Sequence, residues 1–296
     1  MMLMQAIRKG PRPRTLDLIE DYSLEITAKD VDNLAQAALK IPAGTRISVT
    51  FLPNEDLQAR IEAAATVRRL GFVPVPHISA RRLRSQHELE GFLEALAREA
   101  RIDDAFVVAG DPPRPEGPYE DALAVIRSGL LEKYGIRHIG ISGYPEGHPD
   151  IGPDKLMQAM RDKLARIEAQ GLEASITTQF GFDAAPILSW LERIRAAGIH
   201  EPVRIGVPGP CNVGTLLRFA ARCGVGASAS VMAKYGVSIT RVLSTAGPDP
   251  LVTALAAGLD PAVHGSVSLH LYPFGGLLKS AEWAEGFMSA QAAATR

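Results

Sequence analysis

The chain has 296 residues, of which 46% are hydrophobic and 22% charged, and its formal net charge is -1. This composition is typical of a globular protein with a sizeable core. The balanced charge and the lack of a basic stripe argue against a nucleic-acid partner. No stretch approaches the run of about 18 apolar residues that a membrane-spanning helix needs, so no membrane partner is expected.

Cysteine usage and the start of the chain bear on the compartment. Cys211 and Cys223 are too few for a disulfide framework, and no Cys-x-x-Cys pair occurs. The first ten residues lack the apolar core of a signal peptide. We therefore expect a cytoplasmic protein. It should form a single domain over 1–296, with 1–20 as an N-terminal extension and 277–296 as a C-terminal helix, and its surface permits a homo-oligomer.

Strand-like and helix-like segments alternate along the chain. Short β-rich runs predict eight strands, at residues 22–27, 46–52, 72–78, 105–109, 138–143, 175–180, 203–207 and 266–271. Between the first two, Val31, Leu34, Ala35 and Ala38 stand at helical spacing. Such alternation is the pattern of parallel βα units.

Capping residues mark two of the helices. Asn54 is expected to cap the helix after the second strand, and Gly71 to end it. Asp183 should cap the helix after the sixth strand, which ends near Gly198. The long interval 208–265, with a helical segment at 251–259, should add helices between the seventh and eighth strands.

Eight alternating units favour an α/β fold of the closed (β/α)8 type, the TIM barrel. A doubly wound open sheet also alternates, but a dinucleotide-binding version opens with a glycine-rich turn after its first strand. Here Ala28, Lys29 and Asp30 follow that strand. The barrel is therefore the preferred interpretation.

Polar side chains gather at the predicted carboxyl ends of the strands, where barrel enzymes build their active sites. In chain order they are Glu25, Thr50, His77, Asp111, Tyr144, Glu146, His148, Thr178, Gln179, His270 and Tyr272. If Leu24 and Ile26 face the helices, Glu25 points into the barrel, where an unpaired carboxylate is costly. Packing alone does not explain this set.

Structural readings stay open for several of these residues. Asp111 could cap the segment after it, His77 and His148 could be hydrogen-bonded structural histidines, and Gln179 could bind a backbone group. The cluster Arg81, Arg82 and Arg84 reads as a solvated helix start. No metal is expected, because no His-x-His or His-Glu-x-x-His pattern occurs.

Six motifs in order resemble the methylenetetrahydrofolate reductase family. They are Pro-His-Ile at 76–78, Gly-Asp-Pro-Pro at 110–113, Tyr-Pro-Glu-Gly-His-Pro at 144–149, Thr-Gln-Phe at 178–180, Pro-Gly at 208–209 and His-Leu-Tyr at 270–272. The resemblance covers about residues 20–275. It implies a TIM barrel that reduces 5,10-methylenetetrahydrofolate to 5-methyltetrahydrofolate with a hydride from NADH or NADPH.

The resemblance also implies roles for individual residues. Glu25 matches the general acid that opens the methylene bridge to an iminium ion, a task that suits an acid with a raised pKa. Asp111 matches the aspartate that binds the pterin and stabilises positive charge, while Gln179 and Tyr144 match substrate-binding positions. The positions that line the cofactor are Thr50, His77, Gly110, Tyr119, His148 and Lys163, with Tyr119 and Lys163 aligned less closely.

Departures from the family pattern concern FAD. FAD-dependent members usually carry Arg-Gly-Asp where this chain has Ala109, Gly110 and Asp111. The missing arginine would face the flavin phosphates. The residues around His77, Gln179 and Gly209 are similar to those of the flavin-independent branch of the family. In that branch NAD(P)H passes hydride directly to the folate. FAD thus stays possible, with direct transfer preferred.

Two other functions fit the same pattern. A pterin-binding TIM-barrel methyltransferase would need the pterin site but would oxidise no nicotinamide. A non-catalytic folate-binding subunit would tolerate loss of the acid, so the presence of Glu25 counts against it. We therefore expect an oxidoreductase acting on a folate.

Overall fold

Eight parallel strands close into a barrel in the computed structural model, which describes residues 18–52, 55–222 and 245–294. The predicted N-terminal extension falls almost wholly outside the described residues. The strands are β1 (Ser23–Ile26), β2 (Arg46–Val49), β3 (Val73–Ser79), β4 (Asp104–Val108), β5 (His138–Gly143), β6 (Glu173–Phe180), β7 (Val203–Pro208) and β10 (Val267–Tyr272). All eight predicted strands are confirmed.

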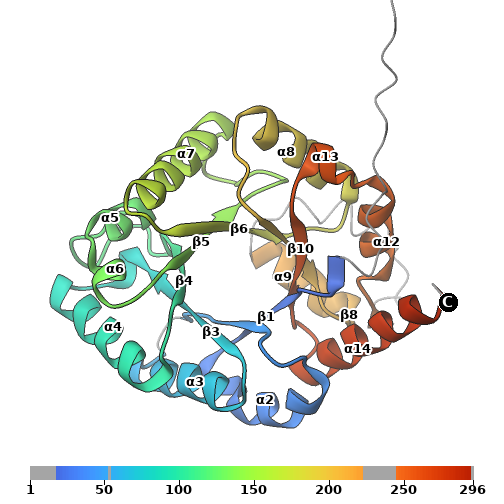
Figure 1. The fold of residues 1–296 in the computed structure, drawn as a ribbon, viewed down its shortest axis with the longest axis horizontal. Coiled ribbons are helices and arrows are strands. Elements are labelled where there is room, and N and C mark those ends of the chain that lie inside the picture. The colour runs from blue at the N-terminus through green and yellow to red at the C-terminus, as the bar shows by residue number, and fades with distance from the viewer. Residues whose placement is uncertain (1–17, 53–54, 223–244, 295–296) are drawn as a thin grey trace, which may run out of the picture.

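Helices form the outer ring of the barrel (Figure 1). They are α2 (Val31–Ala37), α3 (Leu57–Arg69), α4 (Gln86–Ala100), α5 (Ala122–Arg127), α6 (Leu130–Lys133), α7 (Pro153–Ala169), α8 (Ala184–Ala196) and α14 (Leu277–Ala294). Three 3-10 turns accompany them: η1 (Ala28–Asp30), η2 (Ala38–Lys40) and η3 (Ala80–Arg82). The last helix, α14, packs against α2, so the two ends of the barrel sequence lie side by side. The expected TIM barrel is confirmed.

Alternation along the strands separates the core from the lumen. On β1, Leu24 and Ile26 are buried against the helices, whereas Ser23 and Glu25 take the other face. The outward-facing apolar residues of all eight strands join the helix stripes in one cluster. The inward-facing strand positions carry mostly polar or small side chains, so the polar groups of the strands gather inside the barrel.

Two helix caps were predicted, one correctly. Asp183 caps α8 by accepting a hydrogen bond from the Ala185 backbone. The cap of α3 is Asp56, whose side chain accepts from the Gln58 backbone, and not Asn54, which lies outside the described residues. Asparagine and aspartate are both favourable N-cap residues. Because α3 begins at Leu57, the residue in the N-cap position is Asp56.

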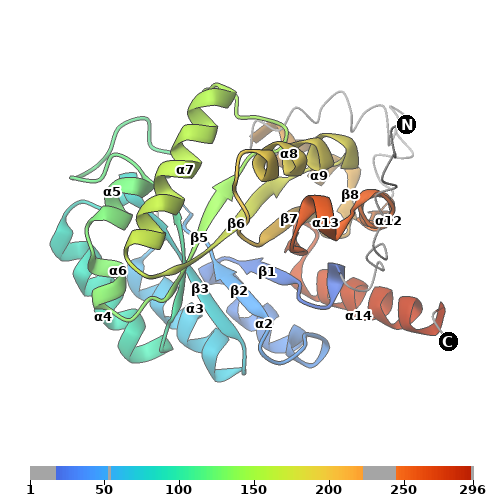
Figure 2. The same cartoon turned by 45° about the horizontal axis from the view of Figure 1, so that its top comes forward.

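Extra elements lie between β7 and β10, as expected. They are the short antiparallel pair β8 (Cys211–Asn212) and β9 (Thr245–Ala246), and the helices α9 (Val213–Arg222), α12 (Asp249–Gly258) and α13 (Pro261–His264). Figure 2 shows them on the β7 and β10 side of the barrel. A second apolar cluster, including Phe180 and Leu216, joins α9 to the carboxyl end of β6.

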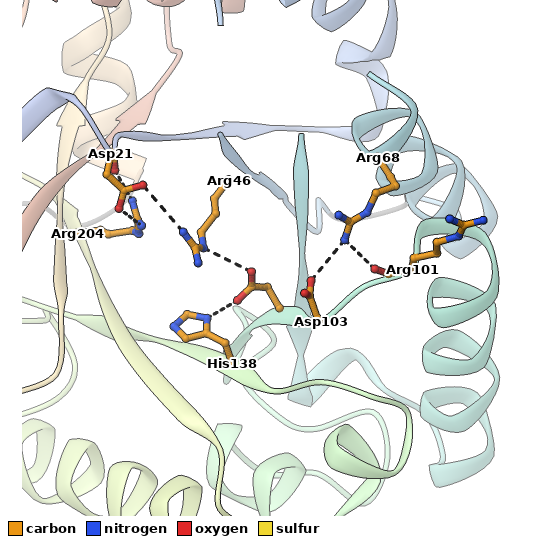
Figure 3. A network of polar contacts seen from close by, with 8 residues as sticks. Asp21, Arg46, Arg68, Arg101, Asp103, His138 and Arg204 are labelled. Carbon is orange, nitrogen blue, oxygen red and sulfur yellow. Dashed lines mark hydrogen bonds and ion pairs between the residues drawn. The ribbon is translucent and has the colours of Figure 1, made fainter. Parts of the chain in front are cut away.

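The amino-terminal end of the lumen is closed by charged side chains, the floor cluster (Figure 3). It contains Asp21, Arg46, Asp104, His138 and Arg204. Asp104 lies 2.5 Å from His138 Nδ1 and 3.4 Å from Arg46 Nε, and Arg204 Nη2 lies 2.7 Å from the carboxylate of Asp21. Burial alone would raise the pKa of Asp104, but His138 and Arg46 lower it overall.

Candidate functional site

Glu25 lies inside the carboxyl half of the barrel, between two histidines. Its Oε2 is 4.0 Å from His77 Nε2 and 3.9 Å from His270 Nε2. The side chain of Glu25 is 21% exposed, so the carboxyl group is only partly shielded from solvent. Sequence reasoning placed Glu25 in the lumen correctly, but it did not pair it with imidazoles.

Burial determines the protonation of His77. Its pKa is lowered to about 4, mainly by burial and further by the neighbouring His270 and Arg60, while Glu25 partly opposes the shift. His77 is therefore neutral near pH 7. Its ring packs 4.7 Å from Phe106, and its backbone oxygen accepts a hydrogen bond from Arg60.

Asp111 follows β4 and meets Arg82 from η3. Arg82 Nη2 and Nε lie 2.5 and 2.9 Å from Asp111 Oδ1. Asp111 is 66% exposed, whereas Arg82 is 14% exposed. The carboxylate is thus open to a ligand, and a nearly buried cation holds it in place.

The arginine cluster after β3 is not the expected solvated helix start. Arg81 donates to the backbone oxygens of Pro112 and Glu120, and Arg82 binds Asp111. Only Arg84 extends into solvent, 3.8 Å from Glu116. Local sequence patterns do not reveal these contacts, because the partners lie 29 to 39 residues further along the chain.

Gly110 has the conformation that its loop requires. Its φ is +93°, and a Cβ there would come within 2.2 Å of Ser79 Oγ. A glycine is therefore needed to bring the Asp111 loop against the end of β3. This close approach is a structural reason for the Gly-Asp pair.

Tyr144, His148 and Gln179 line one hollow at the ends of β5 and β6. The rings of Tyr144 and His148 meet edge to face at 5.1 Å. His148 Nδ1 accepts from the Asp150 backbone, and Gln179 Oε1 accepts from the Phe180 backbone. The amide nitrogen of Gln179 and Nε2 of His148 have no hydrogen-bond partner in the described part of the chain, so both could meet a ligand.

Glu146 borders the same hollow and was not assigned a role. Burial raises its pKa, the Phe182 backbone lowers it, and Asp183 raises it further. Its Oε1 is buried without a hydrogen-bond partner among the described residues. The sequence signal was its place within the Tyr-Pro-Glu-Gly-His-Pro motif.

Thr50 directly follows β2. Its backbone donates to Ile26, and its hydroxyl is buried without a partner in the described part of the chain. A buried hydroxyl of this kind fits a polar group of a bound molecule. The cofactor-lining role of Thr50 stays a prediction.

Tyr119 and Lys163 are each influenced by a carboxylate outside this set, Glu90 and Asp121 respectively. Tyr119 is buried, and burial together with Glu90 raises its pKa. Lys163 on α7 has its pKa lowered by burial, with Asp121 opposing. None of the contacts described here joins either side chain to Glu25, Asp111 or Gln179.

The described residues contain no group of three or more histidine, cysteine, aspartate or glutamate side chains arranged to hold a metal. None of their helices has the length and apolar character needed to cross a membrane. The groups that make up the candidate site are Glu25, Asp111 and the hollow lined by Tyr144, His148 and Gln179.

Comparison with known proteins adds a sequence relationship. The family profile described as Methylenetetrahydrofolate reductase matches residues 21–240. Methylenetetrahydrofolate reductase 2 of Saccharomyces cerevisiae is 33% identical over 135 residues, 43% of this chain and 21% of that protein. Methylenetetrahydrofolate reductase (NADH) 1 of Arabidopsis thaliana is 26% identical over 208 residues, 62% of this chain and 33% of that protein. The match spans only a third or less of these relatives.

A solved structure shares the fold. It is an uncharacterized protein from Clostridium thermocellum described as binding two copies of 5-methyl-5,6,7,8-tetrahydrofolic acid. The TM-score is 0.61 at 10% identity, covering 92% of this chain and 95% of that one. This likeness concerns the fold alone, whereas the profile match covers most of the chain, from β1 past α9. The chain belongs to the methylenetetrahydrofolate reductase family.

Proposed function

We propose that this chain reduces 5,10-methylenetetrahydrofolate to 5-methyltetrahydrofolate, using hydride from NADH or NADPH. The observation that carries the proposal is Glu25, a carboxylic acid inside the barrel with two imidazoles 3.9 and 4.0 Å away. Family membership supports the same reaction.

Glu25 serves as the general acid. Its proton goes to the folate nitrogen that leaves as one carbon–nitrogen bond of the methylene bridge breaks, and the remaining bond becomes an iminium. A nicotinamide supplies a hydride to the iminium carbon when it is bound, which completes the methyl group. Glu25 recovers a proton from water, so one NAD(P)H and one proton are consumed per turnover.

Asp111 binds the pterin and stabilises positive charge on the folate. Its high exposure and its fixed position beside Arg82 suit a carboxylate that meets a ligand from solution. Gln179 and Tyr144, on one hollow, supply further pterin contacts. The aspartate, glutamine and tyrosine orient the ring so that the methylene carbon faces Glu25.

Direct hydride transfer without FAD is the preferred route. Ala109 stands where the flavin-dependent pattern has arginine, and its backbone oxygen accepts from Arg81. Arg82, the nearby cation, is already paired with Asp111. The NADH in the name of the Arabidopsis relative supports a nicotinamide donor. Thr50, His77 and His148 then contact nicotinamide or maintain structure, Gly110 and Tyr119 shape the loop between β4 and α5, and Lys163 has a structural place on α7.

The test is an absorbance spectrum of the purified protein, followed by NADH and NADPH oxidation with methylenetetrahydrofolate, with and without added FAD. A colourless protein that oxidises a nicotinamide only when folate is present supports direct transfer. Flavin absorbance, or activity that requires FAD, would keep the reduction but reject the direct route. No oxidation under any condition would reject the reductase, in favour of the methyltransferase or the binding subunit.

A further inference from the structure

We propose that Ser23 and His270 are a positioning pair that directs an imidazole N–H at Glu25 and fixes the orientation of this acid. The inference rests on the proposed function for its catalytic consequence. Neither residue is expected to touch substrate.

The pair is defined by a buried contact across the closure of the barrel. Ser23 Oγ lies 2.8 Å from His270 Nδ1, although 247 residues separate them. Both are 2% exposed. They sit directly opposite each other in the register of β1 and β10, so the backbone itself aligns them.

The hydroxyl of Ser23 determines which ring nitrogen carries the proton. A buried hydroxyl needs an acceptor, and Nδ1 of His270 is the one that the described residues provide for it. Ser23 therefore donates to Nδ1, which leaves Nδ1 unprotonated. In the neutral ring the proton must then be on Nε2.

Nε2 of His270 is the atom that faces Glu25, at 3.9 Å from Oε2. This distance is longer than a direct hydrogen bond, so the interaction is electrostatic. His77, the second imidazole, approaches the same oxygen at 4.0 Å. Because both rings engage Oε2, Oε1 is the oxygen available to the folate.

A fixed orientation of Glu25 should favour catalysis. A glutamate side chain has freely rotating terminal bonds, and an acid that must reach one particular nitrogen gains from a fixed orientation. The tautomer selected by Ser23 prevents the lone pair of Nε2 from facing the carboxylate, which would repel it. His270 is thus a positioning residue, and Ser23 positions it in turn.

Two amide substitutions separate the two ring nitrogens. The amide group of glutamine reaches the place of Nε2, whereas that of asparagine reaches only the place of Nδ1. We expect His270→Gln to keep kcat within about threefold, and His270→Asn to lower it about tenfold or more with KM little changed. Equal losses, or a better asparagine variant, would overturn the proposal.

Ser23 offers a matched set of variants. Ser23→Ala should lower kcat about tenfold, and Ser23→Thr, which retains the hydroxyl, should restore most of it. Ser268→Ala, which removes an inward hydroxyl two residues from His270 on β10, should leave kcat unchanged. If Ser23→Thr behaves like Ser23→Ala, the hydroxyl is not the active element and the proposal fails.

Nitrogen NMR of the full chain tests the pair without any activity. Protonated and unprotonated imidazole nitrogens differ strongly in ¹⁵N chemical shift, so the His270 tautomer is directly visible. We expect Nε2–H in the wild type and a mixture in Ser23→Ala; Nδ1–H in the wild type would overturn the inference. If the tautomer is as expected but no nicotinamide is oxidised, the pair stands and the proposed function fails.

Discussion

Arg82 holds Asp111 through a single carboxylate oxygen, with Nη2 and Nε at 2.5 and 2.9 Å from Oδ1. The guanidinium carbon of Arg82 also lies 5.2 Å from the centroid of the Phe51 ring, which the guanidinium carbon of Arg60 approaches to 4.0 Å. Stacking and burial fix the arginine, and the arginine fixes the aspartate. Both contacts use Oδ1, and among the described residues Oδ2 has no hydrogen-bond partner, so it is available to a ligand.

Asp111→Ala should weaken binding of 5-methyltetrahydrofolate at least about tenfold, because the carboxylate is the exposed polar group of this corner. The measurement is the dissociation constant by calorimetry or fluorescence quenching. An unchanged constant would reject the role of Asp111 as a pterin ligand.

Arg82→Gln should weaken the same binding about three- to tenfold, since Asp111 would lose the cation that orients it. Arg84→Gln is the matched control, because Arg84 is 77% exposed and 3.8 Å from Glu116. It should bind folate as the wild type does. Equal effects of the two variants would show that general charge, and not the Asp111 contact, matters.

Glu25→Gln should lower kcat by about two to four powers of ten, because an amide cannot deliver the proton that opens the methylene bridge. Folate binding should fall far less, since the amide keeps the shape of the acid. Single-turnover rates and dissociation constants measured together check this. Near-normal turnover would rule out Glu25 as the acid.

His77 should make stability depend on pH. Its pKa in the folded protein is about 4, below the value of about 6.5 for an unfolded histidine. Between these values the unfolded chain binds more protons, so the free energy of unfolding falls as the pH falls from 6.5 to 4. The total loss is on the order of 2 to 3 kcal/mol.

His77→Gln should flatten this part of the curve in urea denaturation at several pH values. His200→Gln, at an exposed histidine before β7, should leave the slope as it is in the wild type. The same slope in all three proteins would mean that His77 does not titrate in this way.

Asp104→Asn should lower the free energy of unfolding by about 3 kcal/mol, because Arg46 and His138 lose their buried partner. Asp103→Asn, which changes an exposed pair with Arg68, should cost less than about 1 kcal/mol. Steady-state activity should survive in both variants, because the floor cluster is at the end of the barrel away from Glu25. A marked loss of kcat in Asp104→Asn would contradict that separation.

Features that depend on local sequence patterns, such as strands and helix caps, could be predicted from the sequence. Strand alternation gave all eight strands and the inward direction of Glu25, and Asp183 was recognised as a cap. Competing candidates of the same chemistry could not be ranked, as with Asn54 and Asp56. Local reasoning also missed long-range partners, including the bond of Ser23 to His270 and the contact of Arg82 with Asp111. The Ser23–His270 pair exists only once β1 and β10 close the barrel, and the Arg82–Asp111 pair requires β3 and β4 to lie side by side.

The floor cluster also constrains the order in which the chain can become native. Its members come from the segment just before β1 and from β2, β4, β5 and β7. Asp104 and His138 already meet on the neighbouring strands β4 and β5, but the whole cluster forms only when the ring is complete. A strand slipped by one residue would turn its charge out of the lumen and leave the opposing ions unmatched. The floor cluster therefore favours the native register of the strands over registers shifted by one residue. If the chain is cut between β4 and β5, the two fragments should associate with β4 and β5 in their native register, because that register pairs the charges of the floor cluster.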